Sequence, residues 1–391
     1  MGFKHDLYLS RRPLAGFVAI GVSWSTYFAQ MPVIKAQVGA SDGAYGGAVL
    51  LASLGAIAAM WLAPMFQQMF GRIAVSVGIV IVAMGMLTSG TSATLVLLVG
   101  GMALASMGSG VVDVLVNARV SDIEARHGRS LMNLNHALYS FAYAGAALAT
   151  GALREARVGT VTVFLLLAGL LMILALAARD RVADVEEPAL SDMPGEIPHA
   201  VVLLVGLVVL TAFLAEAAAE GWSALHLERT LGGTAGEGAL GPAALGLMMG
   251  IGRLFGHSLS RLVRDTRLML LATLLSALGI GLAGVAPSVP VALLGFAIGG
   301  LGISVVAPLA LGLLGRLVTP DVRLAAISRA SVLGYGAFFF GPPLMGLVAE
   351  GFGLRAAFVV VAAILCLTAL AVMPALARRS MAGQAGPSPA R

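Results

Sequence analysis

The sequence predicts an all-α integral membrane protein with twelve transmembrane helices in two pseudo-symmetric six-helix bundles. Of its 391 residues, 59% are hydrophobic and only 11% are charged. The mean hydropathy is +0.96, and so few charges would not solvate the surface of a water-soluble chain of this length. Twelve apolar stretches each approach the ~20 residues that a helix needs to cross a bilayer. The second six stretches echo the first six at a nearly constant offset, which indicates duplication.

Each stretch is a continuous run rich in Leu, Ala, Val and Gly, unlike the alternating pattern of membrane β-barrel strands. The sequence therefore predicts spanning helices throughout. In chain order, they are expected at residues 14–34, 43–66, 73–91, 94–118, 131–152, 158–178, 200–219, 241–261, 268–286, 290–314, 326–349 and 356–376.

The longest polar interruption divides the chain into two halves. It is rich in acidic residues and proline, which is typical of a linker. The expected parts are an N-terminal six-helix half (1–178), a cytoplasmic linker (179–199), a C-terminal six-helix half (200–376) and a cytoplasmic tail (377–391). Two landmarks support the duplication, because Tyr45 precedes Leu240 by 195 residues and Tyr139 precedes Tyr335 by 196. Parallel repeats of this kind are a known transporter architecture.

The distribution of positive charge predicts the orientation. With a cytoplasmic N-terminus, 17 Lys and Arg residues fall on the inside and 5 on the outside. This asymmetry predicts a multi-pass protein of a bacterial inner membrane with both termini cytoplasmic. The net charge of +5 is then a signal of topology, and no nucleic-acid partner is expected.

Several motifs carry a family resemblance. They are Gln30-Met31-Pro32-Val33-Ile34-Lys35, Asp113-Val114-Leu115-Val116-Asn117, Gly128-Arg129-Ser130-Leu131-Met132-Asn133, Glu220-Gly221-Trp222-Ser223, Gly334-Tyr335-Gly336 and Gly341-Pro342-Pro343. Over about its full length the chain resembles transporters of the major facilitator superfamily. It is most similar to the bacterial sugar-permease-like branch that includes fucose permease. The resemblance implies the major facilitator fold and a central cavity lined by helices one, four, seven and ten.

The chain also departs from family patterns at two places. Gln68 stands where the usual motif after the second helix has an acidic residue, which puts a charge-based cytoplasmic latch in doubt. Residues 142–151 lack the proline that is typical of proton-driven drug exporters. The second departure argues against an antiporter.

Ionisable groups at membrane depth mark candidate functional sites. Asp113 and Asn117 are four residues apart and share a helix face, as do His136 and Ser140. Asp113 and His136 are expected at the same depth, facing one another or a shared water-filled pocket. A carboxyl group with restricted hydration can exchange protons near neutral pH, so this pair is predicted to couple transport to protons. Alternatively, Asp113 only ties down Asn117 or Arg119.

Glu216 and Glu220 form a second acidic pair on the seventh helix. Glu216 is the deeper of the two and is predicted to bind substrate or protons. Glu220 and Trp222 are expected near the outer interface, where a charge and an indole both suit the environment. Arg253 lies deep in its helix and needs a carboxylate or backbone partner, which the sequence does not identify.

Neutral and aromatic groups complete the predicted substrate site. Trp24, Tyr27 and Gln30 on the first helix, with Asn117 and Glu216, could bind a polyhydroxylated solute by hydrogen bonds and stacking. Trp24 could instead serve only in packing.

No cofactor or metal is expected. Cys366 is the single cysteine, which excludes disulfides within the chain and a cysteine metal site. The glycine runs do not follow strands and are predicted to pack helices closely.

These observations predict a secondary active transporter that works by alternating access and is not an enzyme. Proton-coupled symport of a hydrophilic metabolite such as a sugar is the first choice, with the protein acting as a monomer. One alternative is proton-coupled efflux of amphipathic compounds, favoured if Met248, Met249 and residues 338–340 line the cavity rather than face lipid or pack. Another alternative is a non-transporting membrane sensor.

Overall fold

The computed structural model describes residues 3–129, 131–179, 198–259 and 263–384. Within these ranges the regular structure is entirely helical, which confirms the all-α prediction. The α-helices are α1 (Phe3–Gln37), α2 (Asp42–Phe70), α3 (Ala74–Gly90), α4 (Leu95–His127), α5 (Met132–Glu155), α6 (Thr160–Ala177), α7 (His199–Leu225), α8 (Ala235–Leu259), α9 (Asp265–Val285), α10 (Val289–Leu317), α11 (Pro320–Leu367) and α12 (Met373–Gln384). Three short segments complete the set, a 3₁₀ turn at Gly71–Ile73 and π-helical turns at His226–Thr230 and Thr368–Val372.

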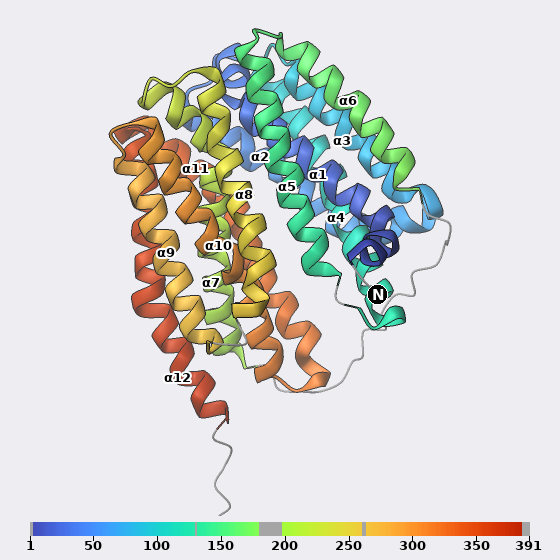
Figure 1. Cartoon of the computed structure of the whole chain (residues 1–391), viewed down its shortest axis with the longest axis vertical. Coiled ribbons are helices and arrows are strands. Elements are labelled where there is room, and N and C mark those ends of the chain that lie inside the picture. The colour runs from blue at the N-terminus through green and yellow to red at the C-terminus, as the bar shows by residue number, and fades with distance from the viewer. Residues whose placement is uncertain (1–2, 130, 180–197, 260–262, 385–391) are drawn as a thin grey trace, which may run out of the picture.

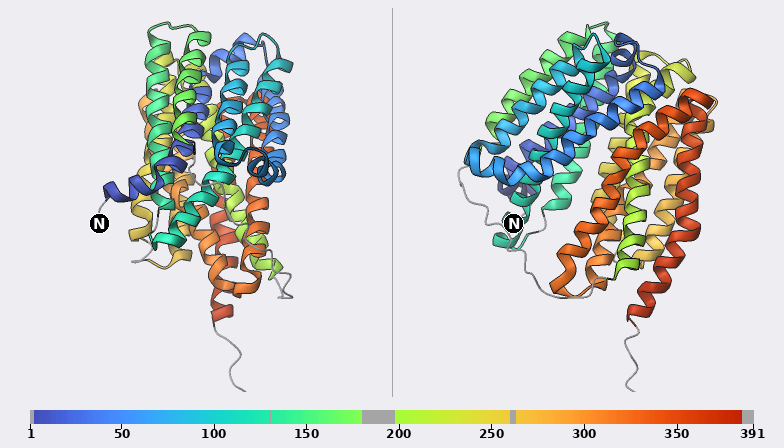
Figure 2. Two further views of the ribbon diagram at one scale, coloured as in Figure 1. Left: turned by 90° about the vertical axis from the view of Figure 1, so that its right-hand side faces the viewer. Right: turned by 180° about the vertical axis from the view of Figure 1, so that it is seen from behind.

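Each predicted span overlaps a helix of the structure, but the last two are divided differently. The eleventh span lies in α11, and the twelfth begins in α11 and continues through the π-helical turn at Thr368–Val372 into α12. Between these two spans α11 is broken at Gly353, where φ is 82° and the backbone is not helical. A positive φ suits glycine because it has no Cβ. Figure 2 shows the chain reversing direction in this region, so the two legs of α11 cross the bundle in opposite directions.

Ten helical stretches of the described chain are long and apolar enough to cross a membrane. One of them, Ala325–Ser380, contains both legs of α11. The polar helix α5 is not among the ten, since it carries Asn133, Asn135, His136 and two tyrosines. A spanning helix that faces a cavity or other helices tolerates such residues.

Helices α1 to α6 lie together on one side of the molecule and α7 to α12 on the other (Figure 1). The two groups meet near one end and diverge toward the end where α1 begins and α12 ends, called here the termini end. The opposite end is called the far end. Residues 180–197 and 385–391 lie outside the described residues, so the linker, tail and half boundaries stay predictions.

The two groups contact each other through α5 against α8 and α2 against α11. Small residues permit these contacts. A Cβ on Gly46 of α2 would lie 2.5 Å from the carbonyl oxygen of Pro342, and one on Gly151 of α5 would lie 2.7 Å from the Cβ of Ala239. Close backbone approach through glycine is the usual way in which membrane helices pack.

A matched pair of glycines tests this packing within the first group. A Cβ on Gly85 of α3 would overlap the backbone of Ala105 on α4, whereas a Cβ on Gly100 of α4 would meet nothing within 4 Å. We expect Gly85→Ala to destabilise the protein by about 1–3 kcal/mol through overpacking. Gly100→Ala should be neutral or gain up to about 1 kcal/mol from helix propensity. Thermal unfolding in detergent measures both, and equal midpoints for the two variants would contradict the close α3–α4 packing.

Candidate functional site

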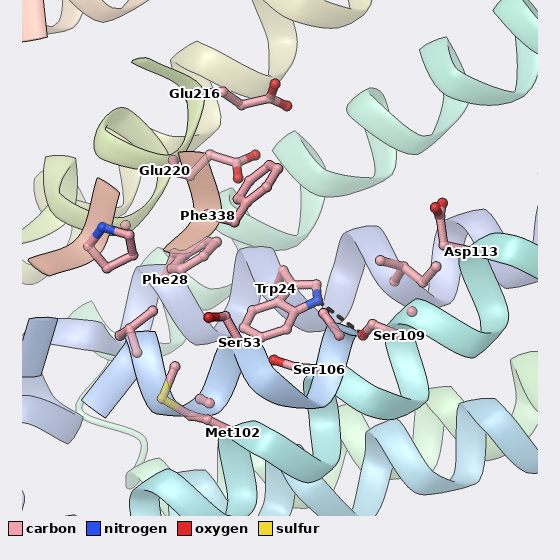
Figure 3. A pocket seen from close by; sticks show the side chains of 18 of the residues that line it. Trp24, Phe28, Ser53, Met102, Ser106, Ser109, Asp113, Glu216, Glu220 and Phe338 are labelled. Atoms are coloured by element: carbon pink, nitrogen blue, oxygen red, sulfur yellow. Dashed lines mark hydrogen bonds between the residues drawn. The ribbon is translucent and has the colours of Figure 1, made fainter. Parts of the chain in front are cut away.

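A cavity of about 290 Å³ lies between the two groups of helices. Its walls come from α1, α2 and α4 of the first group, Tyr139 of α5, and α7 and α11 of the second (Figure 3). The residues that line it are Ile20, Trp24, Phe28, Tyr45, Val49, Ala52, Ser53, Ala56, Met102, Ser106, Ser109, Gly110, Asp113, Tyr139, Glu216, Ala217, Glu220, Gly221, Trp222, Phe338 and Pro342. The lining is mostly apolar and aromatic, with a few polar groups, as in typical small-molecule sites.

Three carboxyl groups reach the cavity, and no Lys, Arg or His is among the described residues of its lining. Asp113 projects from α4, whereas Glu216 and Glu220 project from α7 (Figure 3). Trp24 and Phe28 lie between the acidic groups of α7 and the serines of α4. The cavity surface therefore carries carboxyl groups at two places, over a mostly apolar lining.

Glu216 has a basic partner just outside the lining. The Nη2 atom of Arg253 lies 3.6 Å from its carboxylate, and Arg253 also donates a hydrogen bond of 2.5 Å from Nη1 to the Ser140 hydroxyl. Arg253 thus connects α8 with α7 and with α5 of the other group. Glu216 is therefore the carboxylate partner that Arg253 was expected to need and that the sequence did not identify.

Asp113 and Asn117 lie on one face of α4, as their spacing predicts. The Asn117 side-chain amide donates to Asp113 Oδ1 at 3.0 Å and to the Asp113 carbonyl at 2.8 Å. Asn117 itself is not among the lining residues. Asn117 therefore bonds to a residue that lines the cavity without lining the cavity itself.

His136 lies apart from the cavity lining. Its ring packs edge-on against Phe17, with ring centroids 4.9 Å apart. Within the described residues no hydrogen bond or ion pair joins His136 to Asp113, so their proton-coupling role stays a prediction.

The first helix faces the cavity with a different set of residues than predicted. Trp24 lines the cavity, stacks on Phe28 with centroids 5.7 Å apart, and donates to the Ser109 hydroxyl at 3.0 Å. Tyr27 is fully buried, and its hydroxyl lies 3.1 Å from that of Tyr45 and 3.0 Å from Met102 Sδ. Gln30 is also buried outside the lining. Ile20, Trp24 and Phe28 share one face, and Tyr27 and Gln30 are turned away from it.

Two further aromatic side chains line the cavity. Trp222, expected near the outer interface, is 2% exposed, packs edge-on against Tyr45 and lines the cavity together with Glu220. Phe338, which the sequence allowed to line the cavity, face lipid or pack, lines the cavity, whereas Phe340 is 71% exposed.

The cavity also involves helices that the resemblance did not imply. The described part of α10 supplies none of its lining, whereas α2 supplies five residues. Tyr45, Val49, Ala52, Ser53 and Ala56 recur at helical spacing along one face. This stripe of small and polar residues was the available sequence signal for α2.

Ion pairs join the two groups at the far end, beyond the cavity. Arg154 of α5 makes two hydrogen bonds, 2.6 and 2.9 Å, to the carboxylate of Glu228 just after α7. Asp42 at the start of α2 accepts bonds of 2.8 and 2.5 Å from Arg229 and lies 2.9 Å from Lys35 Nζ. We call these five residues the far-end cluster.

A carboxylate of the second group adds to the contacts at this end. Glu350 of α11 accepts hydrogen bonds from the Ser41 hydroxyl, at 2.9 Å, and from the backbone N–H of Gly43, at 2.5 Å. The far end is thus closed by charge-assisted hydrogen bonds between groups, which are stronger than neutral ones.

No group of three or more His, Cys, Asp and Glu residues suited to a metal ion occurs in the part of the chain that the structure describes. Cys366 is exposed and unpaired on α11.

Comparison with known proteins finds relatives that are named as transporters. Residues 205–391 match the family model of the Major Facilitator Superfamily. The chain is 28% identical over 363 residues to the uncharacterized transporter y4wD of Sinorhizobium fredii, covering 91% of this chain and 95% of that relative. It is 29% identical over 373 residues to an uncharacterized MFS-type transporter of Yersinia pestis, covering 93% and 94%.

Two solved structures have a similar fold. A bacterial homologue of the human lysosomal transporter Spinster, in an inward-facing and occupied conformation, aligns with a TM-score of 0.76 at 16% identity, over 99% of this chain and 100% of that one. The human organic anion transporter MFSD10 aligns with a TM-score of 0.61 at 16% identity, over 93% and 99%. These likenesses show the fold, and the sugar-permease-like branch stays a prediction. The family-model match over the second half of the chain, the relatives named as transporters and the shared fold thus make this chain similar to transporters of the major facilitator superfamily.

Proposed function

We propose that this protein is a secondary active transporter that moves a small amphipathic solute across a bacterial inner membrane by alternating access, coupled to protons. The observation that carries the proposal is the cavity between the two groups of helices, with charged groups inside it and ion pairs closing its far end. If the charge asymmetry sets the orientation, the far end faces the periplasm and this conformation faces inward. The Spinster homologue with the similar fold is likewise described as inward-facing.

The lining favours an amphipathic solute over a sugar. A sugar needs many neutral hydrogen-bonding partners, yet Tyr27, Gln30 and Asn117 lie outside the lining. Six aromatic side chains line the cavity instead: Trp24, Phe28, Tyr45, Tyr139, Trp222 and Phe338. The missing proline in α5 removes one feature of drug exporters, but it does not alter the surface that a solute would meet.

The charge of the lining favours a solute with positive charge. Asp113, Glu216 and Glu220 are the carboxyl groups among the described lining residues, and Arg253 balances one of them at most. Aromatic faces attract an organic cation by about 0.5–2 kcal/mol each. A protonated or quaternary amine on an apolar body would therefore match the cavity in charge and shape.

A matched pair of ligands tests this proposal. Ethidium is an aromatic cation, and phenanthridine has its ring system but is uncharged near neutral pH. We expect ethidium to raise the melting temperature of the detergent-purified protein, because a ligand at a hundred times its dissociation constant stabilises the folded state by about 2.7 kcal/mol. Phenanthridine should have a much smaller effect, and L-fucose none. A shift with L-fucose alone would restore the sugar proposal.

Transport itself is measured in proteoliposomes with an imposed pH gradient. We expect the gradient to drive ethidium movement together with a change in internal pH reported by a trapped dye. Ligand binding without any solute movement would favour the sensor alternative.

A further inference from the structure

A second cavity, of about 230 Å³, lies at the termini end between the first turns of α1 and the last turns of α4. It is separate from the central cavity and shares no lining residue with it. The start of α1 bends away from the bundle and runs toward the side, as the left view of Figure 2 shows. Pro13, which lines this second cavity, lies inside α1. A proline inside a helix removes one backbone hydrogen bond and permits such a bend.

The lining of this cavity is strongly basic. Arg11, Arg12, Arg119 and Arg126 line it, against Asp122 as the single carboxylate of the described lining. Asp122 accepts a hydrogen bond of 2.9 Å from Arg126 and lies 4.0 Å from Arg119. Four guanidinium groups of the described lining therefore face one carboxylate. The partial negative charge at the C-terminal end of α4 offsets part of this positive charge.

The arginines are held in place by local contacts. Arg11 stacks over the Tyr8 ring at 3.9 Å and donates to the Tyr8 carbonyl. The side chain of Arg119 is only 11% exposed. Guanidinium groups arranged around a cavity bind phosphate oxygens in pairs and with defined geometry.

The cavity also has an apolar side, formed by Leu9, Pro13 and Ile123. Its lining residues lie just outside the spans predicted from sequence, 14–34 and 94–118, and lipid headgroups are expected at the ends of the spans. Basic pockets at helix ends on the cytoplasmic side suit anionic headgroups.

We propose that this cavity binds a phosphate group, supplied by the headgroup of an anionic phospholipid such as phosphatidylglycerol. The phosphate lies among Arg11, Arg12 and Arg119, and the glycerol and upper acyl chain contact Leu9 and Ile123. The proposal is independent of the solute that the central cavity carries.

Lipid binding to the purified full-length protein tests it, measured by native mass spectrometry with phosphatidylglycerol and phosphatidylethanolamine. The wild type should bind phosphatidylglycerol preferentially. The double variant Arg12→Gln/Arg119→Gln should bind it about thirty-fold more weakly, since each arginine near a membrane surface contributes about fivefold. The matched double variant Arg267→Gln/Arg378→Gln removes two exposed arginines outside the cavity and should bind like the wild type.

Melting temperatures distinguish a phospholipid headgroup from inorganic phosphate as the source of the phosphate group. They also show whether each variant is folded. Phosphatidylglycerol should raise the melting temperature of the wild type more than that of the cavity variant, whereas ethidium should still stabilise both. Stabilisation by inorganic phosphate at millimolar concentration, with no preference for phosphatidylglycerol, would overturn the lipid assignment in favour of a soluble anion. Equal binding of both lipids, or equal losses in the two double variants, would overturn the site.

Discussion

Asp113→Asn is expected to abolish movement of solute driven by a pH gradient, while exchange of solute across the membrane at equal pH continues. Asn has nearly the shape of Asp and cannot ionise, so the variant removes the proton and keeps the packing. Asp113 lines the cavity and its carboxyl group is held by Asn117, which can also bond to an amide after reorientation. We expect gradient-driven accumulation to fall by roughly tenfold or more, because an intramembrane carboxyl group is a typical proton carrier.

The matched control is Asp122→Asn, on the same helix. Asp122 lies outside the central cavity, in the lining of the second one, and pairs with Arg126. Gradient-driven ethidium movement in proteoliposomes should stay near the wild-type value in this control. Full gradient-driven movement in Asp113→Asn would remove Asp113 from the coupling mechanism and leave Glu216 and Glu220 as the candidates.

The sequence predicted contacts within one helix better than contacts between helices. The hydrogen bond from Asn117 to Asp113 follows from a spacing of four residues, which fixes a shared face. The contact of Arg253 with Glu216 joins residues 37 positions apart on different helices. Hydropathy indicates that such a buried cation needs a partner, but it carries no information on which helices are neighbours.

The rotation of a spanning helix about its axis was the other main source of error. Trp24 faces the cavity and Tyr27, three residues later, does not. In a helix with apolar residues on all sides, hydrophobic periodicity does not distinguish the face toward a cavity from the face toward its neighbours. Trp222 was expected near the interface, just beyond the predicted end of the span at residue 219. In the structure α7 continues to Leu225, and Trp222 is buried against Tyr45.

The far-end cluster leads to the second large effect. Arg154→Met is expected to open the far end, because it leaves the Glu228 carboxylate without its bidentate partner. Arg154 also donates to the Ala29 carbonyl of α1 at 2.7 Å and to the Ala235 carbonyl of α8 at 3.3 Å, so the same change removes two further contacts. Breaking a buried ion pair costs about 3 kcal/mol or more. Such a cost shifts a two-state equilibrium by roughly a hundredfold toward the conformation that does not contain the pair.

Cysteine labelling measures the shift. Replacing Cys366 by serine removes the chain's one thiol, and Ser53→Cys then places a single thiol on the cavity wall. A membrane-impermeant maleimide added to whole cells should label Ser53→Cys slowly when Arg154 is present and much faster in Arg154→Met. The control Arg355→Met removes an arginine at the same end that bonds to the Ala286 carbonyl within the second group, and it should leave labelling slow.

A double variant decides whether the ion pair itself closes the far end. Replacing a buried ion pair by two apolar residues is often neutral, because the cost of desolvating both charges disappears together with their attraction. We therefore expect Arg154→Met/Glu228→Met to label more slowly than Arg154→Met alone. Fast labelling in both would mean that the contact of Arg154 with the Ala235 carbonyl of α8, at 3.3 Å, rather than the charge pair, holds the two groups together. Unchanged labelling in Arg154→Met would exclude Arg154 from the closure. Alternating access requires that these contacts break in every cycle, so the pair must be strong enough to close the far end and weak enough to be replaced by water when the solute leaves.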